Sequence, residues 1–314
     1  MKRKAIIISI AGLKLSLKER KLIQKEKPWG IILFRRNIKT IPQVKKLTQS
    51  IRKCINDKVY PILIDEEGSR VTRLSAIFNN KFPQRFFGDL YKLDQNVALK
   101  IYEHYIISVI KTLKNLGINI NTVPVLDKLS TTTHQIIGNR SFSNDTNIIN
   151  DLGKLCVKVY NKKKISTVMK HIPGHGSANS DSHLTMPIVN KSYKYLENND
   201  FICFKNINSK IAMTAHILYK NIDSQNCATQ SNYIISNVIR KKLGFKGLLV
   251  SDDIAMKALK SDLINNAIKS LNAGCNIVLY CTGKYHESVK LLKNVPYIDN
   301  FTQKKTSELY RFLR

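Results

Sequence analysis

The sequence predicts an α/β protein built as a single (β/α)8 TIM barrel. Eight short, apolar and β-branched runs recur at fairly regular intervals along the chain, with amphipathic segments between them. Continuous hydrophobicity, as opposed to alternation, is typical of parallel strands buried on both faces. Eight such strands that alternate with helices close into a barrel. The length of 314 residues allows either two average domains or one barrel, and we expect a single domain over residues 1–314.

The expected strands, in chain order, are Ala5–Ile10, Gly30–Phe34, Pro61–Asp65, Ile118–Val123, Ser166–His171, Ile211–His216, Gly247–Asp252 and Asn276–Tyr280. The expected helices between them are Ile41–Lys53, Asn96–Leu116, Asn147–Asn161, Tyr193–Asn206, Asn232–Leu243 and Ile254–Asn272. A doubly wound sheet is the alternative arrangement. It is less favoured because no G-x-G-x-x-G follows the first run, as a dinucleotide-binding fold would require.

Composition narrows the class of protein. Hydrophobic residues make up 43% of the chain, enough for a large core, and no apolar run approaches the roughly 20 residues of a membrane span. The basic start followed by an apolar run resembles an export signal, but the run is short and lacks a small-residue cleavage site, so we interpret it as the first strand. Six scattered cysteines without CxxC spacing suit a reducing compartment. We therefore expect a cytoplasmic protein.

The net charge of +30 is the strongest compositional signal. It could indicate nucleic-acid binding, but the lysines are spread over the whole chain and no binding module is visible. The chain is also rich in Ile and Asn, whose codons, like those of Lys, are A/T-rich. The charge is therefore expected from a biased genome, and nucleic acid is not the expected partner. Weak attraction for anionic substrates is a simpler consequence.

Polar residues end five successive apolar runs. They are Asp65 after the third run, Asp127 after the fourth, Lys170 and His171 at the end of the fifth, His216 at the end of the sixth, and Asp252 and Asp253 at the end of the seventh. In a barrel, the carboxyl ends of the strands converge on one mouth, where barrel enzymes carry out chemistry. The eighth run offers little charge and is interpreted as structural.

A histidine-rich segment follows the fifth run. Three of the seven histidines lie between His171 and His183, and Asp181 precedes His183 by two residues. A carboxylate at this spacing can orient the imidazole, and such a pair can act as a general acid and base. The alternatives are a surface loop with satisfied histidines or a zinc site. Zinc usually takes three or four ligands at recognisable spacing, and no cysteine lies nearby.

Four motifs together resemble a known family. KHIPGHG followed by DSH, DEEGSRVTR, GNRSF and LGFKGLLVSDDIAM occur in the order found in bacterial β-N-acetylglucosaminidases of glycoside hydrolase family 3, the cytoplasmic enzymes of peptidoglycan recycling. The resemblance extends from about Ile6 to Cys281. Its most specific part is DSH, because family 3 β-glucosidases take their acid/base residue from a second domain. The family fold is a single-domain TIM barrel.

The resemblance implies a role for each matching residue. Asp252 would be the nucleophile, and His183 the general acid/base with Asp181 as its partner. The N-acetylglucosamine next to the cleaved bond would be held by Asp65, Arg73, Arg140, Lys170 and His171. The implied reaction is hydrolysis, with retention, of terminal β-linked N-acetylglucosamine in peptidoglycan fragments such as GlcNAc-1,6-anhydroMurNAc, with or without peptide. It requires no metal and no organic cofactor, and we expect a monomer.

Each of these residues also has a structural interpretation. Asp252 could cap a helix near Ile254, but Asp253 can do so equally well, so catalysis is favoured for Asp252. Arg73 and Arg140 could form surface salt bridges. Asp65 needs a partner or ligand if it is buried.

Structural hydrogen bonding is expected for His175 and His216, whereas Glu66 and Glu67 are expected behind the site or exposed to solvent. The family usually has glycine at Ser69, where a positive φ would strain serine, and commonly has aspartate at Asn276. Three other functions stay open. They are a family 3 β-glycosidase with another sugar preference, a glycoside phosphorylase, and a non-catalytic basic binding protein.

Overall fold

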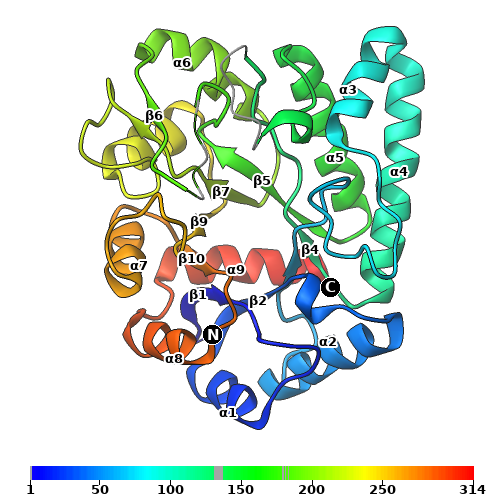
Figure 1. Cartoon of the computed structure of the whole chain (residues 1–314), viewed down its shortest axis with the longest axis vertical. Coiled ribbons are helices and arrows are strands. Elements are labelled where there is room, and N and C mark those ends of the chain that lie inside the picture. Colours follow the sequence, from blue (N-terminus) through cyan, green and yellow to red (C-terminus); the bar gives the residue numbers. More distant parts are fainter. Residues whose placement is uncertain (1, 131–136, 179, 181, 183) are drawn as a thin grey trace.

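The computed structural model describes residues 2–130, 137–178, 180, 182 and 184–314. Within these residues, eight parallel strands form a closed barrel in the spatial order β1-β10-β9-β7-β5-β4-β3-β2 (Figure 1). The strands are β1 (Lys4–Ile8), β2 (Pro28–Leu33), β3 (Ile62–Ile64), β4 (Ile120–Asn121), β5 (Ser166–Ile172), β7 (Ile211–Thr214), β9 (Leu248–Asp253) and β10 (Ile277–Tyr280). All eight predicted strands are present, and the barrel fold is confirmed. The extent of the catalytic domain over residues 1–314 stays a prediction.

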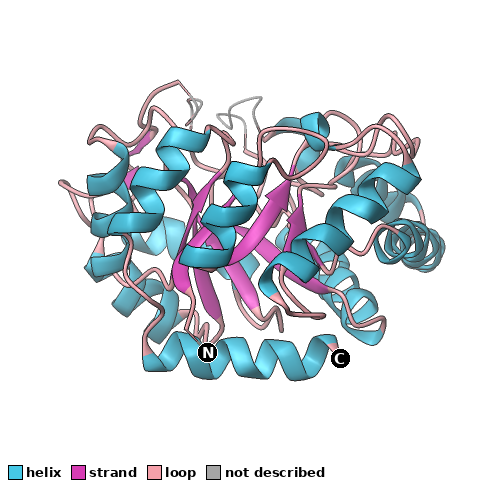
Figure 2. Cartoon of the chain, turned by 90° about the horizontal axis from the view of Figure 1, so that it is seen from below, coloured by secondary structure: helices cyan, strands magenta, loops and turns pink. Residues whose placement is uncertain are grey.

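Helices surround the barrel (Figure 2). They are α1 (Leu17–Glu26), α2 (Ile41–Ile55), α3 (Gln84–Leu93), α4 (Gln95–Asn115), α5 (Thr146–Lys162), α6 (Tyr193–Asn199), α7 (Leu263–Asn272), α8 (Tyr285–Asn294) and α9 (Asn300–Leu313). The α9 helix lies across the amino-terminal end of the barrel, where the Trp29 indole N–H donates to Thr306 Oγ1 at 2.9 Å. The opposite end, where the strands finish, is therefore the open one.

Two predicted helices differ from the observed ones. The helix predicted over Ile254–Asn272 begins only at Leu263, because Asp253 Oδ1 accepts from the Ala255 amide and holds the chain in turns after β9. The helix predicted over Tyr193–Asn206 is α6 followed by a short 3-10 helix, η3 (Phe201–Phe204). The next predicted helix forms as η4 (Ile234–Lys242), with π-type hydrogen bonding.

Some elements were not predicted. They are helices α1, α3, α8 and α9 and a small parallel sheet of β6 (Ile188–Val189) and β8 (Leu218–Tyr219). All six cysteines are free thiols, and five of them are buried. None of the helices within the described residues has the length and apolar character to cross a lipid bilayer.

The α3 helix sets the position of the loop after β4. Gly88 packs directly against the backbone of Phe142, and a Cβ atom at Gly88 would overlap the Phe142 carbonyl group. Gln84, on the same helix, donates from Nε2 to the carbonyls of Val125 and Arg140, both at 2.8 Å. The short helix η2 (Gly138–Arg140) is thereby fixed against α3.

Gly88→Ala is expected to destabilise the protein by roughly 3 kcal/mol, because the added methyl group must push the Phe142 backbone away. Gly12→Ala is the matched control, since a Cβ atom at Gly12 meets no atom within 4 Å. Urea unfolding of both variants measures the difference. Equal midpoints for the two variants would show that the α3 contact with this loop is loose.

Candidate active site

A cavity of about 370 Å³ opens at the carboxyl ends of the strands. Its volume lies within the range of small-molecule sites. It is lined by Phe34, Asp65, Glu67, Arg70, Val71, Arg73, Ile137, Arg140, Lys170, His171, His175, Ser182, Met213, Asp252, Asp253, Met256, Leu279 and Cys281. The six predicted site residues that the structure describes therefore border one cavity. Asp181 and His183 lie outside the described residues.

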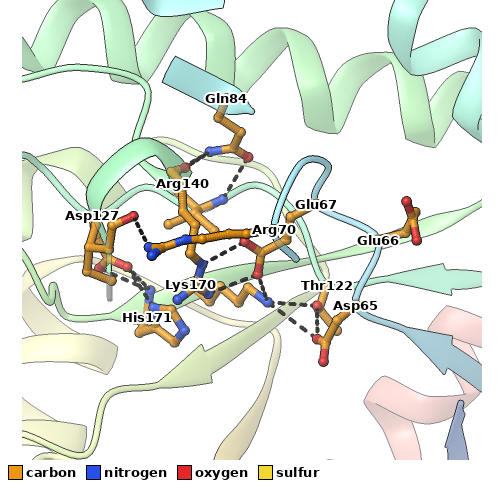
Figure 3. A network of polar contacts seen from close by, with 12 residues as sticks. Asp65, Glu66, Glu67, Arg70, Gln84, Thr122, Asp127, Arg140, Lys170 and His171 are labelled. Carbon is orange, nitrogen blue, oxygen red and sulfur yellow. Dashed lines mark hydrogen bonds and ion pairs between the residues drawn. The ribbon is translucent and has the colours of Figure 1, made fainter. Parts of the chain in front are cut away.

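The buried amine of Lys170 lies between two carboxylates at the centre of this site (Figure 3). Lys170 Nζ is 3.4 Å from Asp65 Oδ1 and 2.5 Å from Glu67 Oε1, and the Thr122 hydroxyl oxygen lies 2.8 Å away. The Lys170 side chain is only 3% exposed. A buried ammonium needs paired counter-charges, and the loop after β3 supplies both of them.

Glu67 also holds Arg140 through two parallel hydrogen bonds. Arg140 Nε donates to Glu67 Oε2 at 2.7 Å, and Arg140 Nη2 donates to Oε1 at 2.9 Å. Such bidentate pairs are strong and directional. Burial alone would raise the pKa of Glu67, but Arg140 and Lys170 outweigh it and lower the pKa to about 2. Of the two expectations for Glu67, exposure to solvent is wrong, because the side chain is buried; it supports the site by pairing with both cations at the edge of the cavity.

Asp65 is held in its ionised form. Arg73 Nη2 donates to Asp65 Oδ2 at 3.1 Å, and the Thr122 hydroxyl donates to Oδ1. Burial works to raise the pKa of Asp65, yet Lys170 and Arg73 hold it well below its usual range. The Arg73 guanidinium also stacks over the Phe34 ring, 5.2 Å from its centroid. Asp65 thus has the partners that its burial requires.

Glu66 holds the loop after β3 together through hydrogen bonds to its buried carboxylate. Its carboxylate accepts from the Thr72 hydroxyl, the amides of Arg73 and Leu74, and Asn80 Nδ2, at 2.7–3.0 Å. The side chain is 1% exposed, and burial raises its pKa despite these bonds. The possibility that Glu66 is exposed is therefore excluded. Its hydrogen bonds hold the backbone that carries Arg73.

The two departures from the family pattern have different consequences. Ser69 has φ of +54°, so the position keeps the left-handed conformation that favours glycine. Asn276 is fully used, since its Oδ1 accepts from Arg240 Nη2 and the Leu249 amide and its Nδ2 donates to Thr302. The amide at position 276 therefore replaces a carboxylate without leaving its neighbours unpaired.

Asp252 and Asp253 end β9 with different surroundings. Asp252 accepts one hydrogen bond within the described part of the chain, from the Asp253 amide at 2.8 Å. Burial raises the pKa of Asp252, but His171 and His216 outweigh it and lower that pKa. Asp253 Oδ1 instead accepts from the amides of Ala255 and Cys281, and burial raises the pKa of Asp253 to about 6. Asp253, not Asp252, therefore holds the turn after β9, while α7 begins later with Asp262 as its N-cap. Asp252 is left as an ionised carboxylate that lines the cavity.

His175 and His216, the two histidines expected to make structural hydrogen bonds, have different surroundings. His216 is buried and bonds through Nδ1 to Thr229 Oγ1 at 2.8 Å and through Nε2 to the Asp253 carbonyl at 3.1 Å. The His175 amide donates to Asp127 at 2.7 Å, but its ring Nδ1 has no partner among the described residues. Burial lowers the pKa of His175 to about 4, so the ring is neutral at pH 7. The expected structural hydrogen bonding is therefore seen for the ring of His216. For His175, within the described residues, the backbone amide takes part but ring Nδ1 does not.

The DSH segment is represented in the described structure by Ser182. Ser182 lines the cavity, and its carbonyl accepts from the Ala258 amide at 3.2 Å. Among the residues that the structure places, no three His, Cys, Asp or Glu side chains come together as metal ligands.

Comparison with known proteins identifies the family. The model of the glycosyl hydrolase family 3 N-terminal domain matches residues 3–307. The chain belongs to glycosyl hydrolase family 3. A β-hexosaminidase of Chromobacterium violaceum is 32% identical, over 89% of this chain and 79% of the relative. Another β-hexosaminidase, from Methylobacillus flagellatus, is 30% identical over 88% of this chain and 80% of its own length.

Solved structures of the family agree. Native NagZ from Neisseria gonorrhoeae superposes with a TM-score of 0.87 at 29% identity, covering 100% of this chain and 90% of that one. A family 3 β-N-acetylglucosaminidase from Paenibacillus sp. FPU-7 gives a TM-score of 0.86 at 27% identity, and this chain spans 98% of its own length but 60% of that longer protein. The family 3 chain is thus a glycoside hydrolase of the type that acts on β-N-acetylhexosamines.

Glu67→Gln is expected to destabilise this family 3 protein by about 3 kcal/mol at pH 7, because Arg140 and Lys170 lose a buried counter-charge. Glu67 has a pKa of about 2 when folded and roughly 4.3 when unfolded. Its contribution is therefore complete above pH ~4.3 and disappears as the pH falls through ~2. Denaturant unfolding between pH 7 and pH 2.5 should show the gap to wild type narrowing only below pH ~4. Asp89→Asn, which breaks the exposed Arg85 pair, is the control and should show little loss. A gap for Glu67→Gln that stays constant down to pH 2.5 would contradict the ion-pair explanation.

Proposed function

We propose that this enzyme removes terminal β-linked N-acetylglucosamine from peptidoglycan fragments, with retention, through a glycosyl-enzyme on Asp252. The observation that carries the proposal is the contrast between the two aspartates at the end of β9. Asp253 is engaged by two backbone amides, whereas Asp252 accepts from only one within the described residues, and it borders the cavity that Asp65, Lys170 and Glu67 also line. A retaining glycosidase needs an ionised carboxylate next to the anomeric carbon.

In the proposed first step, Asp252 attacks the anomeric carbon while His183, as an imidazolium, protonates the leaving oxygen. In the second step, water that has given its proton to the neutral His183 releases the sugar from Asp252. Asp181 keeps His183 in one tautomer and stabilises its cation, as the acid of a catalytic triad does. Support for this dyad comes from Ser182, which lies between the two residues in sequence and borders the cavity.

The sugar would be held by charged residues that line the same cavity as Asp252. Ionised Asp65 accepts from sugar hydroxyls, while Arg73, Arg140 and Lys170 donate to sugar oxygens and His171 contributes a ring nitrogen. The ion pairs that these groups already make hold them in place before substrate enters, which limits the entropy lost on binding. A relative, NagZ from Neisseria gonorrhoeae, has been solved in complex with N-trifluoroacetyl-D-glucosamine, and this supports an N-acylated glucosamine as the ligand.

The proposed substrates are GlcNAc-1,6-anhydroMurNAc and its peptide-bearing forms, which would arise during cell-wall recycling in the cytoplasm. The protein is proposed to act as a monomer, without a metal or organic cofactor. Fragments that carry carboxylates would be attracted by the net charge of +30.

The reaction and its nucleophile can be tested together. We expect wild type to hydrolyse a chromogenic N-acetyl-β-glucosaminide much faster than the matching β-glucoside. Asp252→Asn should abolish the activity, because an amide is a poor nucleophile. Asp253→Asn should stay within about tenfold of wild type, since it keeps Oδ1 as an acceptor and removes only a buried charge. Near-normal turnover by Asp252→Asn would refute the assignment of the nucleophile.

His183→Ala should lower kcat/KM on the natural disaccharide by roughly 10²–10⁴-fold, the usual contribution of a general acid/base. On a substrate with a good leaving group, such as a dinitrophenyl glycoside, the loss should be smaller because the leaving oxygen needs no proton. Comparing the two substrates measures the difference. Equal losses on both would remove His183 from the role of general acid.

The alternatives are distinguished by the product and the ligand. Sugar 1-phosphate, formed only when inorganic phosphate is present, would indicate a phosphorylase. Faster cleavage of the β-glucoside would indicate another sugar preference. Folded protein without glycosidase activity, but with a steeply salt-dependent affinity for DNA, would favour a basic binding protein.

A further inference from the structure

Asp127 is a fully buried carboxylate that joins the loop after β4 to the end of β5. It accepts from the His171 amide at 3.2 and 3.3 Å, from the His175 amide at 2.7 Å, and from His171 Nδ1 at 2.6 Å. Its exposed fraction is 0%. Two of its donors are backbone groups that any acceptor could satisfy. The third is an imidazole nitrogen in a cavity-lining residue.

The bond to Asp127 decides which ring nitrogen of His171 reaches the cavity. An ionised carboxylate can only accept, so Nδ1 must carry its proton toward Asp127. The ring lines the cavity, and Nε2 makes no hydrogen bond within the described part of the chain. Nε2 is therefore the nitrogen available to a bound molecule. Figure 3 shows the ring between Asp127 and the Lys170 cluster.

Other charged groups near Asp127 do not replace His171 as its partner. Burial raises the pKa of Asp127, and His171 is the strongest influence that lowers it. The His175 ring lies 5.8 Å from the His171 ring between centroids and is neutral at pH 7. Arg140 pairs with Glu67. Asp200 accepts from the amide and hydroxyl of Ser177 and contributes no positive charge.

We propose that Asp127 is a positioning residue for the reaction, holding the His171 ring in one tautomer so that Nε2 is presented to the sugar beside Asp252. It forms a second aspartate–histidine pair, separate from Asp181 and His183, and acts on the sugar only through His171. This role rests on the proposed function. An aspartate that fixes a histidine tautomer is worth up to about 10⁴-fold in rate in a serine protease, where asparagine selects the wrong tautomer.

The test is a double-mutant cycle with Asp127→Asn, His171→Asn and the pair. Asparagine at 127 keeps an oxygen for the backbone amides but can turn its NH2 group to Nδ1. We expect Asp127→Asn to lower kcat/KM on the chromogenic N-acetyl-β-glucosaminide by about 10²-fold, by analogy with the upper range for groups that orient metal-binding histidines. In the His171→Asn background the same change should cost less than threefold. Losses that simply multiply would show a structural role for Asp127 and overturn the proposal.

Asp200→Asn is the matched control. Asp200 is also a buried carboxylate that holds the loop after β5, but within the described residues it makes no hydrogen bond to an imidazole. Its loss should multiply with that of His171→Asn. Coupling as strong as that of Asp127 would show that any disturbance of this loop acts through His171, which would also overturn the proposal.

A spectroscopic measurement separates this inference from the proposed function. The ¹⁵N shifts of the histidine rings, with His171 identified by its absence in His171→Asn, need no substrate and no turnover. Wild type should show a protonated Nδ1 at His171, and in Asp127→Asn the proton population should move toward Nε2. An unprotonated Nδ1 in wild type would refute the proposal even if Asp127→Asn failed to fold. If wild type cleaved no glycoside but showed the expected shifts, only the proposed function would fail.

Discussion

The pairing of Lys170 with Asp65 and Glu67 is the interaction on which the site depends. The lysine is on β5, and both carboxylates follow β3, while Glu67 extends the network to Arg140 in the loop after β4. Burying any one of these charges alone would cost folding free energy. Because the four groups neutralise one another, they can lie largely out of contact with solvent at the end of the barrel. The network therefore fixes the loops after β3 and β4 relative to strand β5, and their arrangement sets the shape of the cavity.

The barrel could be predicted because its strands are buried on both faces. A strand that is buried on both faces appears in the sequence as a nearly continuous apolar run. Each of the eight runs forms a strand at the expected place. Helices were harder to predict. The helix expected from Ile254 is delayed to Leu263 because a side-chain cap and a contact with Ser182 hold residues 254–262 in turns. Hydrophobic periodicity does not encode such a contact.

The site could be predicted in part for a related reason. Asp65, Lys170, His171 and Asp252 interrupt or end apolar strands, so sequence alone marks them as unusual. Glu67 did not stand out, because its burial depends on Arg140, which is 73 residues away in the chain. Asp127 was noticed as a polar residue at a strand end, but its contact with His171 spans 44 residues. The available signal was that acidic residues follow the third strand while basic residues follow or end later strands. Only the three-dimensional structure shows which acid pairs with which base.

The charges of the cavity differ from those of the chain as a whole. The protein has 52 lysines and arginines against 22 aspartates and glutamates. In the described lining of the cavity the two signs are equal, with Asp65, Glu67, Asp252 and Asp253 opposite Arg70, Arg73, Arg140 and Lys170. A site for a polyanion would gather cations and exclude acids, because phosphate binding depends on uncompensated positive charge. A balanced set of donors and acceptors instead suits an uncharged polyol, whose hydroxyl groups both donate and accept. The basic composition is thus a property of the outer surface, and the local balance of charge favours a sugar in the cavity.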